Sequence, residues 1–252
     1  MNTALIVILA VSLIGGLFLF KGKASKKSAS ATNAAADATK KPQMTVEEAQ
    51  NVVKGLEDLG YYKYADPKDL DTLRNDLISS LAGYSVLSTV YNERTFIPLD
   101  NRLFLFDGET LFEQNGFMDA INSMRPLFDK MNFKVDITNH IEEADTNWLN
   151  HKVTINGKPY VIFANFEGYG WGEAAQRFAE IINDQLQLQN KDERLYLING
   201  ANDGTAIYLT RDQFNLLDKV LMDERWKPLP VDKWCKVFEV DPTKYKKNYS
   251  QK

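Results

Sequence analysis

Cysteine and histidine are scarce in this chain of 252 residues, which contains one cysteine and two histidines. A single cysteine excludes an internal disulfide framework and any zinc site built on several thiolates. Two histidines leave little material for a histidine-rich metal centre. We therefore expect no metal and no cofactor. The lone thiol, Cys235, is expected to be a small buried hydrophobic residue, as free cysteines usually are.

An excess of basic charge is also absent. Lys and Arg total 30 against 34 Asp and Glu, which gives a net charge of −4. Proteins dedicated to nucleic acids usually carry a basic face or a high pI, so we expect no nucleic acid partner. The charge is unevenly divided, because residues 1–44 carry six lysines and one aspartate, which leaves −9 for residues 45–252.

One long uncharged run is present at the start of the chain. Residues 4–20 read ALIVILAVSLIGGLFLF, and a spanning helix needs about 20 apolar residues with a lower limit near 17. A cleaved signal peptide carries its positive charge before the apolar run, whereas here Lys21, Lys23, Lys26 and Lys27 follow it. The pattern predicts that residues 1–21 form an uncleaved single-pass transmembrane anchor that contacts the bilayer through residues 4–20.

The flanking lysines also predict an orientation. Lysines beside a span tend to remain in the cytoplasm, which places the N-terminus outside and the globular domain in the cytoplasm. The alternative, an exported periplasmic or extracellular domain, stays open because the lysines could simply contact lipid headgroups. Residues 25–43 contain no aromatic or large aliphatic side chain and cannot offset the entropy of ordering. We therefore expect a flexible tether over residues 22–44.

Residues 45–240 are expected to form one globular α+β domain, followed by a basic tail over residues 241–252. Thr45 and Glu48 match a capping box, and Asp66-Pro67 is typical of a second helix start. Residues 45–83 are thus predicted to be a helical hairpin, which either packs against the sheet or forms a subdomain. Further helices are expected over residues 116–131, 171–189 and 210–222.

Strands are expected mainly as hairpins. Asn156-Gly157 is a strong hairpin signal between runs at 151–155 and 160–166, and a second hairpin joins 195–198 to 205–209. Other strands are predicted at 102–106, 133–138 and 234–240. Consecutive hairpins favour a mainly antiparallel sheet of five or six strands, with helices packed on one face.

Two motifs suggest chemistry without matching a known signature. Gly168-Tyr169-Gly170-Trp171-Gly172 precedes a helix, where free N–H groups can cradle an anion, but no Lys-Ser or Lys-Thr pair follows and Glu173 brings a carboxylate. A small-anion sensor is therefore a weaker alternative. His140 and His151 bracket several carboxylates, of which Glu143 is the candidate partner, and a hydrolase using this His/carboxylate cluster is the main alternative. Their spacing matches no compact motif, and polar residues at strand ends are usually just solvated.

Aromatic residues in expected loops carry the leading hypothesis, because Tyr and Trp are enriched at binding hot spots. On an acidic domain they favour a protein partner with a basic surface. We expect a membrane-tethered, non-catalytic protein-binding module rather than an enzyme, such as an immunity-type protein or an adaptor of an envelope machine. The candidate partner-binding residues are Tyr62, Tyr64, Gly168, Tyr169, Gly170 and Trp171.

Overall fold

The computed structural model describes residues 44–145, 149–200 and 204–243. The predicted anchor and most of the predicted tether precede residue 44, and the basic tail from residue 244 onward also lies outside the described residues. Within the described ranges, no helix is both long and apolar enough to cross a membrane.

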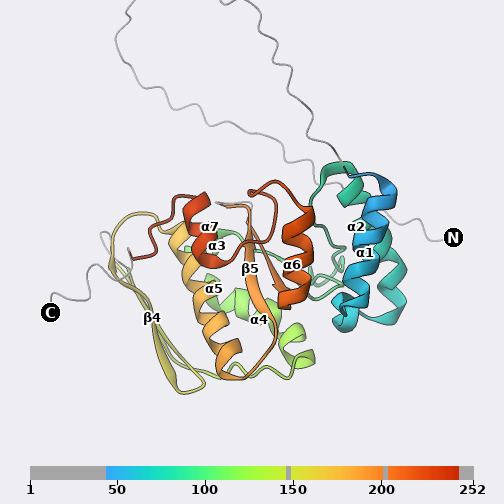
Figure 1. Ribbon diagram of the computed structural model, residues 1–252. Helices are drawn as coiled ribbons and strands as arrows, with labels where there is room; N and C mark the ends of the chain where they lie inside the picture. The colour runs from blue at the N-terminus through green and yellow to red at the C-terminus, as the bar shows by residue number, and fades with distance from the viewer. Residues whose placement is uncertain (1–43, 146–148, 201–203, 244–252) are drawn as a thin grey trace, which may run out of the picture. The chain divides into compact units, whose positions relative to one another are not determined.

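The described residues form an α+β fold with two three-stranded antiparallel sheets, rather than the single sheet expected (Figure 1). The strands of the first sheet follow the order β1-β6-β5, and those of the second follow β2-β3-β4. The strands are β1 (Leu103–Leu105), β2 (Ile137–Ala144), β3 (Leu149–Ile155), β4 (Lys158–Phe166), β5 (Arg194–Ile198) and β6 (Thr205–Leu209). The α-helices are α1 (Val46–Asp58), α2 (Leu70–Tyr84), α3 (Gly108–Phe112), α4 (Gly116–Lys130), α5 (Trp171–Leu188), α6 (Arg211–Val220) and α7 (Val231–Val237), and the short 3-10 helices are η1 (Tyr61–Tyr64) and η2 (Pro67–Asp69).

The local signals at the helix ends are confirmed where a cap depends on a few adjacent residues. Thr45 and Glu48 form the predicted capping box at α1. The Thr210 side chain accepts from the backbone of Gln213 at α6, in a second box. Asp66 caps the 3-10 turn η2, which leads directly into α2. The Asn156-Gly157 hairpin joins β3 to β4, as expected.

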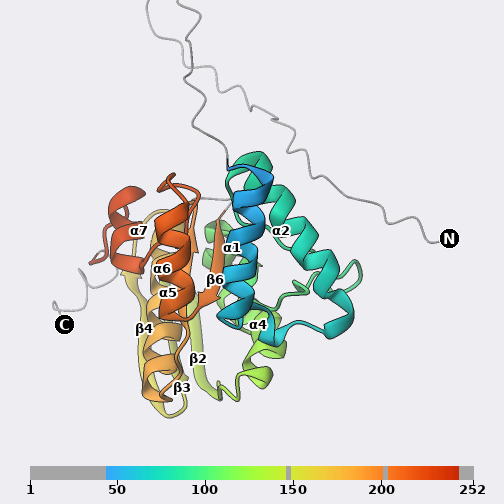
Figure 2. The same ribbon diagram turned by 45° about the vertical axis from the view of Figure 1, so that its right-hand side comes forward.

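Helices cover both faces of the β1-β6-β5 sheet, which corrects the expectation of helices on one face. One face contributes Phe104, Leu197 and Tyr208 to a core shared with α4 and α5. The other face contributes Ile207 and Leu209 to a second core that includes α1, α2 and α6. The N-terminal helical hairpin thus shares a core with this sheet (Figure 2). By contrast, the β2-β3-β4 sheet is covered on one face, by α4 and α5.

Two predicted strands are wrong. Residues 234–237 of this segment form the last part of α7, because Val231 and Trp234 recur at helical spacing after the N-cap residue Pro230. Residues 238–240 follow the helix and are not a strand either. The strand predicted at 133–138 begins only at Ile137 and runs to Ala144. Phe133 and Val135 are buried as their alternation suggested, but they precede the strand.

The outer edge of β5 is closed by side-chain and loop contacts. Asn183 of α5 donates its Nδ2 to the carbonyl of Leu195 at 2.9 Å and accepts the Leu195 N–H at 2.7 Å. Farther along, Leu197 and Leu229 exchange backbone hydrogen bonds. An open strand edge is a template for unwanted pairing, so these contacts protect the fold from edge-to-edge association.

A fully buried arginine joins the helical hairpin to the sheet. The Arg102 guanidinium donates to the carbonyls of Tyr61, Tyr208 (2.8 Å) and Gly60 (3.4 Å), and it lies over the rings of Tyr61 and Tyr64. Burial raises the pKa of the neighbouring carboxyl of Asp100, which accepts the backbone N–H groups of Arg102 and Leu103.

We predict that Arg102→Met lowers the free energy of unfolding by about 3 to 5 kcal/mol, the usual cost of removing one partner from a buried charge network. Asp100 would lose its compensating charge, and the three carbonyls would lose their donor. Urea unfolding followed by circular dichroism measures the change. Arg94→Met, in an exposed loop, is the control, and equal stability of the two variants would contradict this role for Arg102.

Candidate functional site

A β-bulge in β2 turns the side chains of His140 and Glu142 toward the interior. Thr138 pairs with Thr154 and Ile141 pairs with Lys152, so Asn139 and His140 lie opposite the single residue Val153. Asn139 takes the left-handed conformation, with φ of 51°. After the bulge, Ile141 is exposed while His140 and Glu142 share the covered face, because alternate residues of a strand point the same way.

The neighbouring strand brings the second histidine to the same place. His151 pairs with Glu142 across β2 and β3, and it replaces an aliphatic residue in the buried row that also contains Leu149, Val153 and Ile155. A second register shift, between His151 and Lys152, leaves Ile162 as an extra residue on β4. Bulges are common beside functional sites, where they redirect side chains.

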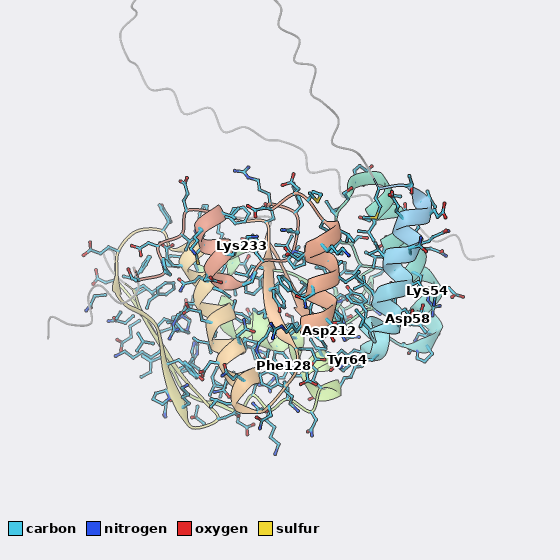
Figure 3. The ribbon with its side chains drawn as sticks, in the orientation of Figure 1. Lys54, Asp58, Tyr64, Phe128, Asp212 and Lys233 are labelled. Atoms are coloured by element: carbon cyan, nitrogen blue, oxygen red, sulfur yellow. The ribbon has the colours of Figure 1, made fainter. Side chains whose placement is uncertain are left out.

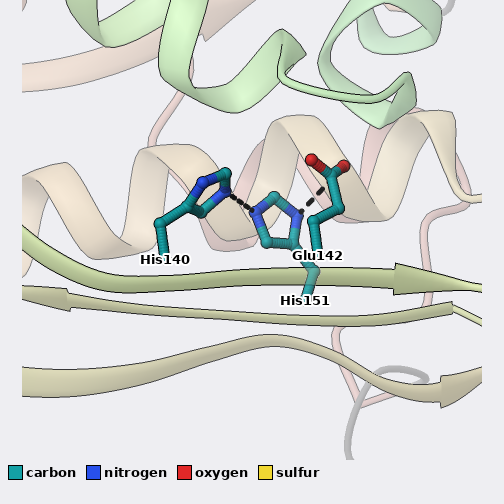
Figure 4. A group of neighbouring side chains, drawn as sticks. All are labelled: His140, Glu142 and His151. Carbon is teal, nitrogen blue, oxygen red and sulfur yellow. Dashed lines mark hydrogen bonds and ion pairs between the residues drawn. The ribbon is translucent and has the colours of Figure 1, made fainter.

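The two histidines of the chain meet through their imidazole rings. The Nε2 atoms of His140 and His151 are 2.9 Å apart, within hydrogen-bond distance (Figure 4). On the other side of the His151 ring, its Nδ1 lies 3.9 Å from Oε1 of Glu142. The three side chains therefore follow one another in the order His140, His151, Glu142.

The surroundings of this His/Glu cluster (His140, Glu142 and His151) hold it in place. The His151 side chain is 2% exposed and that of Glu142 is 9% exposed. The Phe117 ring of α4 contacts the His151 ring edge-on, with centroids 5.6 Å apart. The backbone N–H of Asn115, just before α4, donates to Oε2 of Glu142 at 2.9 Å. Both the sheet and α4 thus fix the cluster.

Burial lowers the pKa of His151 to about 3, and the charge of His140 contributes in the same direction. At neutral pH the His151 ring is therefore uncharged and offers one lone pair, as a metal ligand or a hydrogen-bond acceptor requires. The arrangement can hold a metal ion or pass a proton between the imidazoles. Among the described residues, neither ring hydrogen-bonds a serine, threonine or cysteine side chain.

Sequence reasoning chose Glu143 as the carboxylate of this cluster, but the structure brings Glu142 there. Glu143 is exposed and pairs with Asn150, so it points away from the histidines. The spacing of His140 and Glu142, two residues apart on a strand, is the signal that would have selected the right carboxylate. The alternation was not recognised because the strand was predicted to end at residue 138, before His140.

The glycine loop places its two aromatic residues at the surface. Tyr169 is 81% exposed, and its ring centroid lies 5.8 Å from that of the half-buried Trp171. Gly168 has φ of 85°, a conformation that favours glycine. A Cβ on Gly170 would lie 2.7 Å from the Phe166 ring. Backbone conformation and packing thus account for both glycines without a bound anion.

Beside this loop lies a groove of about 440 Å³. Its aromatic walls come from the loop and from α7 and the residue that follows it, far apart in the sequence: Tyr169, Trp171, Trp234 and Phe238. Arg225, Glu173 and Glu239 add charged groups to its lining. We name this feature the aromatic groove.

The other two aromatic candidates do not reach the surface. Tyr62 and Tyr64 are buried; Tyr64 is labelled in Figure 3. The Tyr64 hydroxyl donates to Glu193 at 2.7 Å. The Tyr64 ring also lies beneath the Arg102 guanidinium. Cys235 is buried as expected, and burial raises its thiol pKa to about 12, which is unsuitable for a thiolate nucleophile.

Comparisons of the chain with protein-family models, with curated proteins and with solved structures found no match.

The lowered pKa of His151 has a measurable consequence. The unfolded chain binds a proton near pH 6.5, whereas folded His151 does so only near pH 3. Stability from the neutral ring is therefore complete above pH 6.5 and is lost as the pH falls toward 3, at up to about 1.4 kcal/mol per pH unit.

In chelator-treated protein we expect the NMR signals of the His151 ring to show no titration between pH 8 and pH 4.5. The chain contains only two histidines, and a His140→Gln variant assigns each signal. A titration midpoint of His151 near 6.5 would contradict the buried, uncharged ring.

Proposed function

We propose that this protein is a membrane-tethered binding module that holds a protein partner at the aromatic groove. The exposure of Tyr169 at the mouth of this groove is the observation that carries the proposal. A tyrosine side chain loses little conformational entropy on binding and offers both apolar area and a hydroxyl. Such residues, placed beside further aromatic walls, are the usual anchors of protein recognition.

The charge of the chain supports a partner with a basic surface. Residues 45–252 carry a net charge of −9, and opposite charge accelerates encounter and discriminates between partners. The groove itself contains two glutamates and one arginine. The apolar rings would therefore supply most of the contact, while the acidic body attracts the partner and orients it.

The proposed anchor would keep this module at a membrane. The six lysines of residues 1–44 would be attracted to anionic lipid, whereas the acidic body would be repelled from it. In this arrangement the tether lets the body stand away from the bilayer and reach a membrane-bound or nearby partner. An adaptor of an envelope machine or an immunity-type protein would work in this way.

We predict that Tyr169→Ala removes partner binding. Full-length protein is captured from its native membranes after crosslinking, and associated proteins are quantified by mass spectrometry. The loss of a central aromatic anchor costs about 2 kcal/mol or more, so we expect recovery of the partner to fall at least about tenfold.

Tyr84→Ala is the matched control, because Tyr84 is 79% exposed at the end of α2 and does not line the groove. Its partner recovery should equal that of the wild type. Equal recovery with Tyr169→Ala, or the absence of any near-stoichiometric partner, would refute the proposed groove.

We predict that a reporter fused to the C-terminus lies in the cytoplasm. In a bacterial host, green fluorescent protein should fluoresce there, and alkaline phosphatase, which needs export to become active, should stay inactive. Deleting residues 1–21 should release the protein from alkali-washed membranes. Active alkaline phosphatase would contradict the orientation, and retention of the shortened chain would contradict the anchor.

A further inference from the structure

We propose that His140, Glu142 and His151 bind a divalent first-row transition-metal ion of the zinc class. In the described part of the chain, these three side chains form a cluster of potential metal ligands. One ligand atom of each lies within 4.8 Å of the others. Two imidazoles and one carboxylate are a donor set that zinc accepts, with the fourth position left for water. This proposal is independent of the aromatic groove and departs from the expectation of no metal.

The distances require only a small adjustment. Zinc lies about 2.0 to 2.1 Å from imidazole nitrogen, so two such ligands in a tetrahedron are about 3.3 Å apart. The two Nε2 atoms, at 2.9 Å, would separate by about 0.4 Å to admit the ion. The carboxylate oxygen of Glu142 lies within 4.8 Å of the imidazole ligand atoms, so it would have to approach by at most about 1.5 Å to reach a tetrahedral ligand spacing. Its Oε1 now faces Nδ1 of His151, so the side chain would also have to rotate toward the Nε2 edge of that ring.

Neighbouring groups hold the three proposed ligands in fixed positions, as a metal site requires. Hydrogen bonds outside the first shell orient the ligands of a metal site, and the Asn115 N–H already holds Oε2 of Glu142. Oε1 is the oxygen that faces His151. The Phe117 ring fixes the plane of the His151 imidazole. The bulge at Asn139 and His140 places the third ligand on the same face.

A hydrogen bond between the two rings is the competing explanation. One neutral ring can donate its Nε2–H to the other, which would satisfy both atoms without an ion. That alternative predicts a folded protein with no stoichiometric metal binding, so a titration separates the two explanations.

The test uses the full-length protein in detergent, purified without a polyhistidine tag and stripped by a chelator. Zn²⁺ is titrated by calorimetry, and Co²⁺ is titrated as a coloured substitute. We expect one ion per chain, and X-ray absorption should show nitrogen ligands with imidazole scattering. Since the chain has only two histidines, that signal can come only from His140 and His151. Mg²⁺, which prefers oxygen ligands, should not compete.

Two substitutions test the ligands. Glu142→Gln should weaken Zn²⁺ binding by at least the roughly 10- to 100-fold that the loss of a hydrogen-bond partner outside the first shell costs, and His140→Ala should weaken it further because it removes one of two imidazoles. Glu143→Gln is the matched control, since Glu143 points away from the cluster, and it should bind as the wild type does. Circular dichroism checks that each variant is folded.

Absence of stoichiometric Zn²⁺ and Co²⁺ binding by the folded wild type would overturn the proposal. Unchanged binding by folded His140→Ala would do the same. Should the variants fail to fold, the imidazole signal in wild-type X-ray absorption decides, because its absence from a bound ion would place the metal elsewhere.

Discussion

The buried guanidinium of Arg102 is the interaction on which the arrangement of the fold depends. It binds carbonyls of the turn after α1 and of β6 at the same time, and so joins the helical hairpin to the sheet. A buried charge is costly unless it is hydrogen-bonded and compensated, and Asp100 with the surrounding carbonyls meets that requirement. Tyr62 and Tyr64, which the sequence analysis assigned to a partner, are buried instead, and the guanidinium lies over the Tyr64 ring. Among the aromatic residues predicted to bind a partner, Tyr169 is the most exposed, and the proposed binding groove therefore depends on it.

Each sheet is adapted to a different role. The β1-β6-β5 sheet is covered on both faces and closed at the β5 edge by Asn183, which makes it a rigid centre. The β2-β3-β4 sheet is covered on one face only, and register shifts interrupt its pairing on both sides of β3. These interruptions direct His140 and Glu142 inward. The covered face of this sheet still contributes to the core that it shares with the first sheet, α4 and α5.

Features set by neighbouring residues could be predicted from the sequence. The caps at Thr45 and Thr210 and the Asn156-Gly157 turn depend on a few adjacent residues, and they were found. The contact between His140 and His151 depends on the β-bulge at Asn139. No local sequence pattern predicts that bulge, because its left-handed residue is an asparagine and not a glycine. The α7 helix was missed because its short run of apolar residues reads equally well as a strand. The burial of Tyr64 involves Arg102, which lies over its ring but is distant in sequence.

Site-specific photocrosslinking in living cells tests the central claim, that the aromatic groove holds a protein partner, most directly. A photoreactive phenylalanine analogue is placed at position 169 in one strain and at position 84 in another, and adducts of the full-length protein are identified after illumination. The account predicts one dominant protein adduct from position 169 and none of that mass from position 84. No adduct at position 169, or the same set of adducts at both positions, would contradict it.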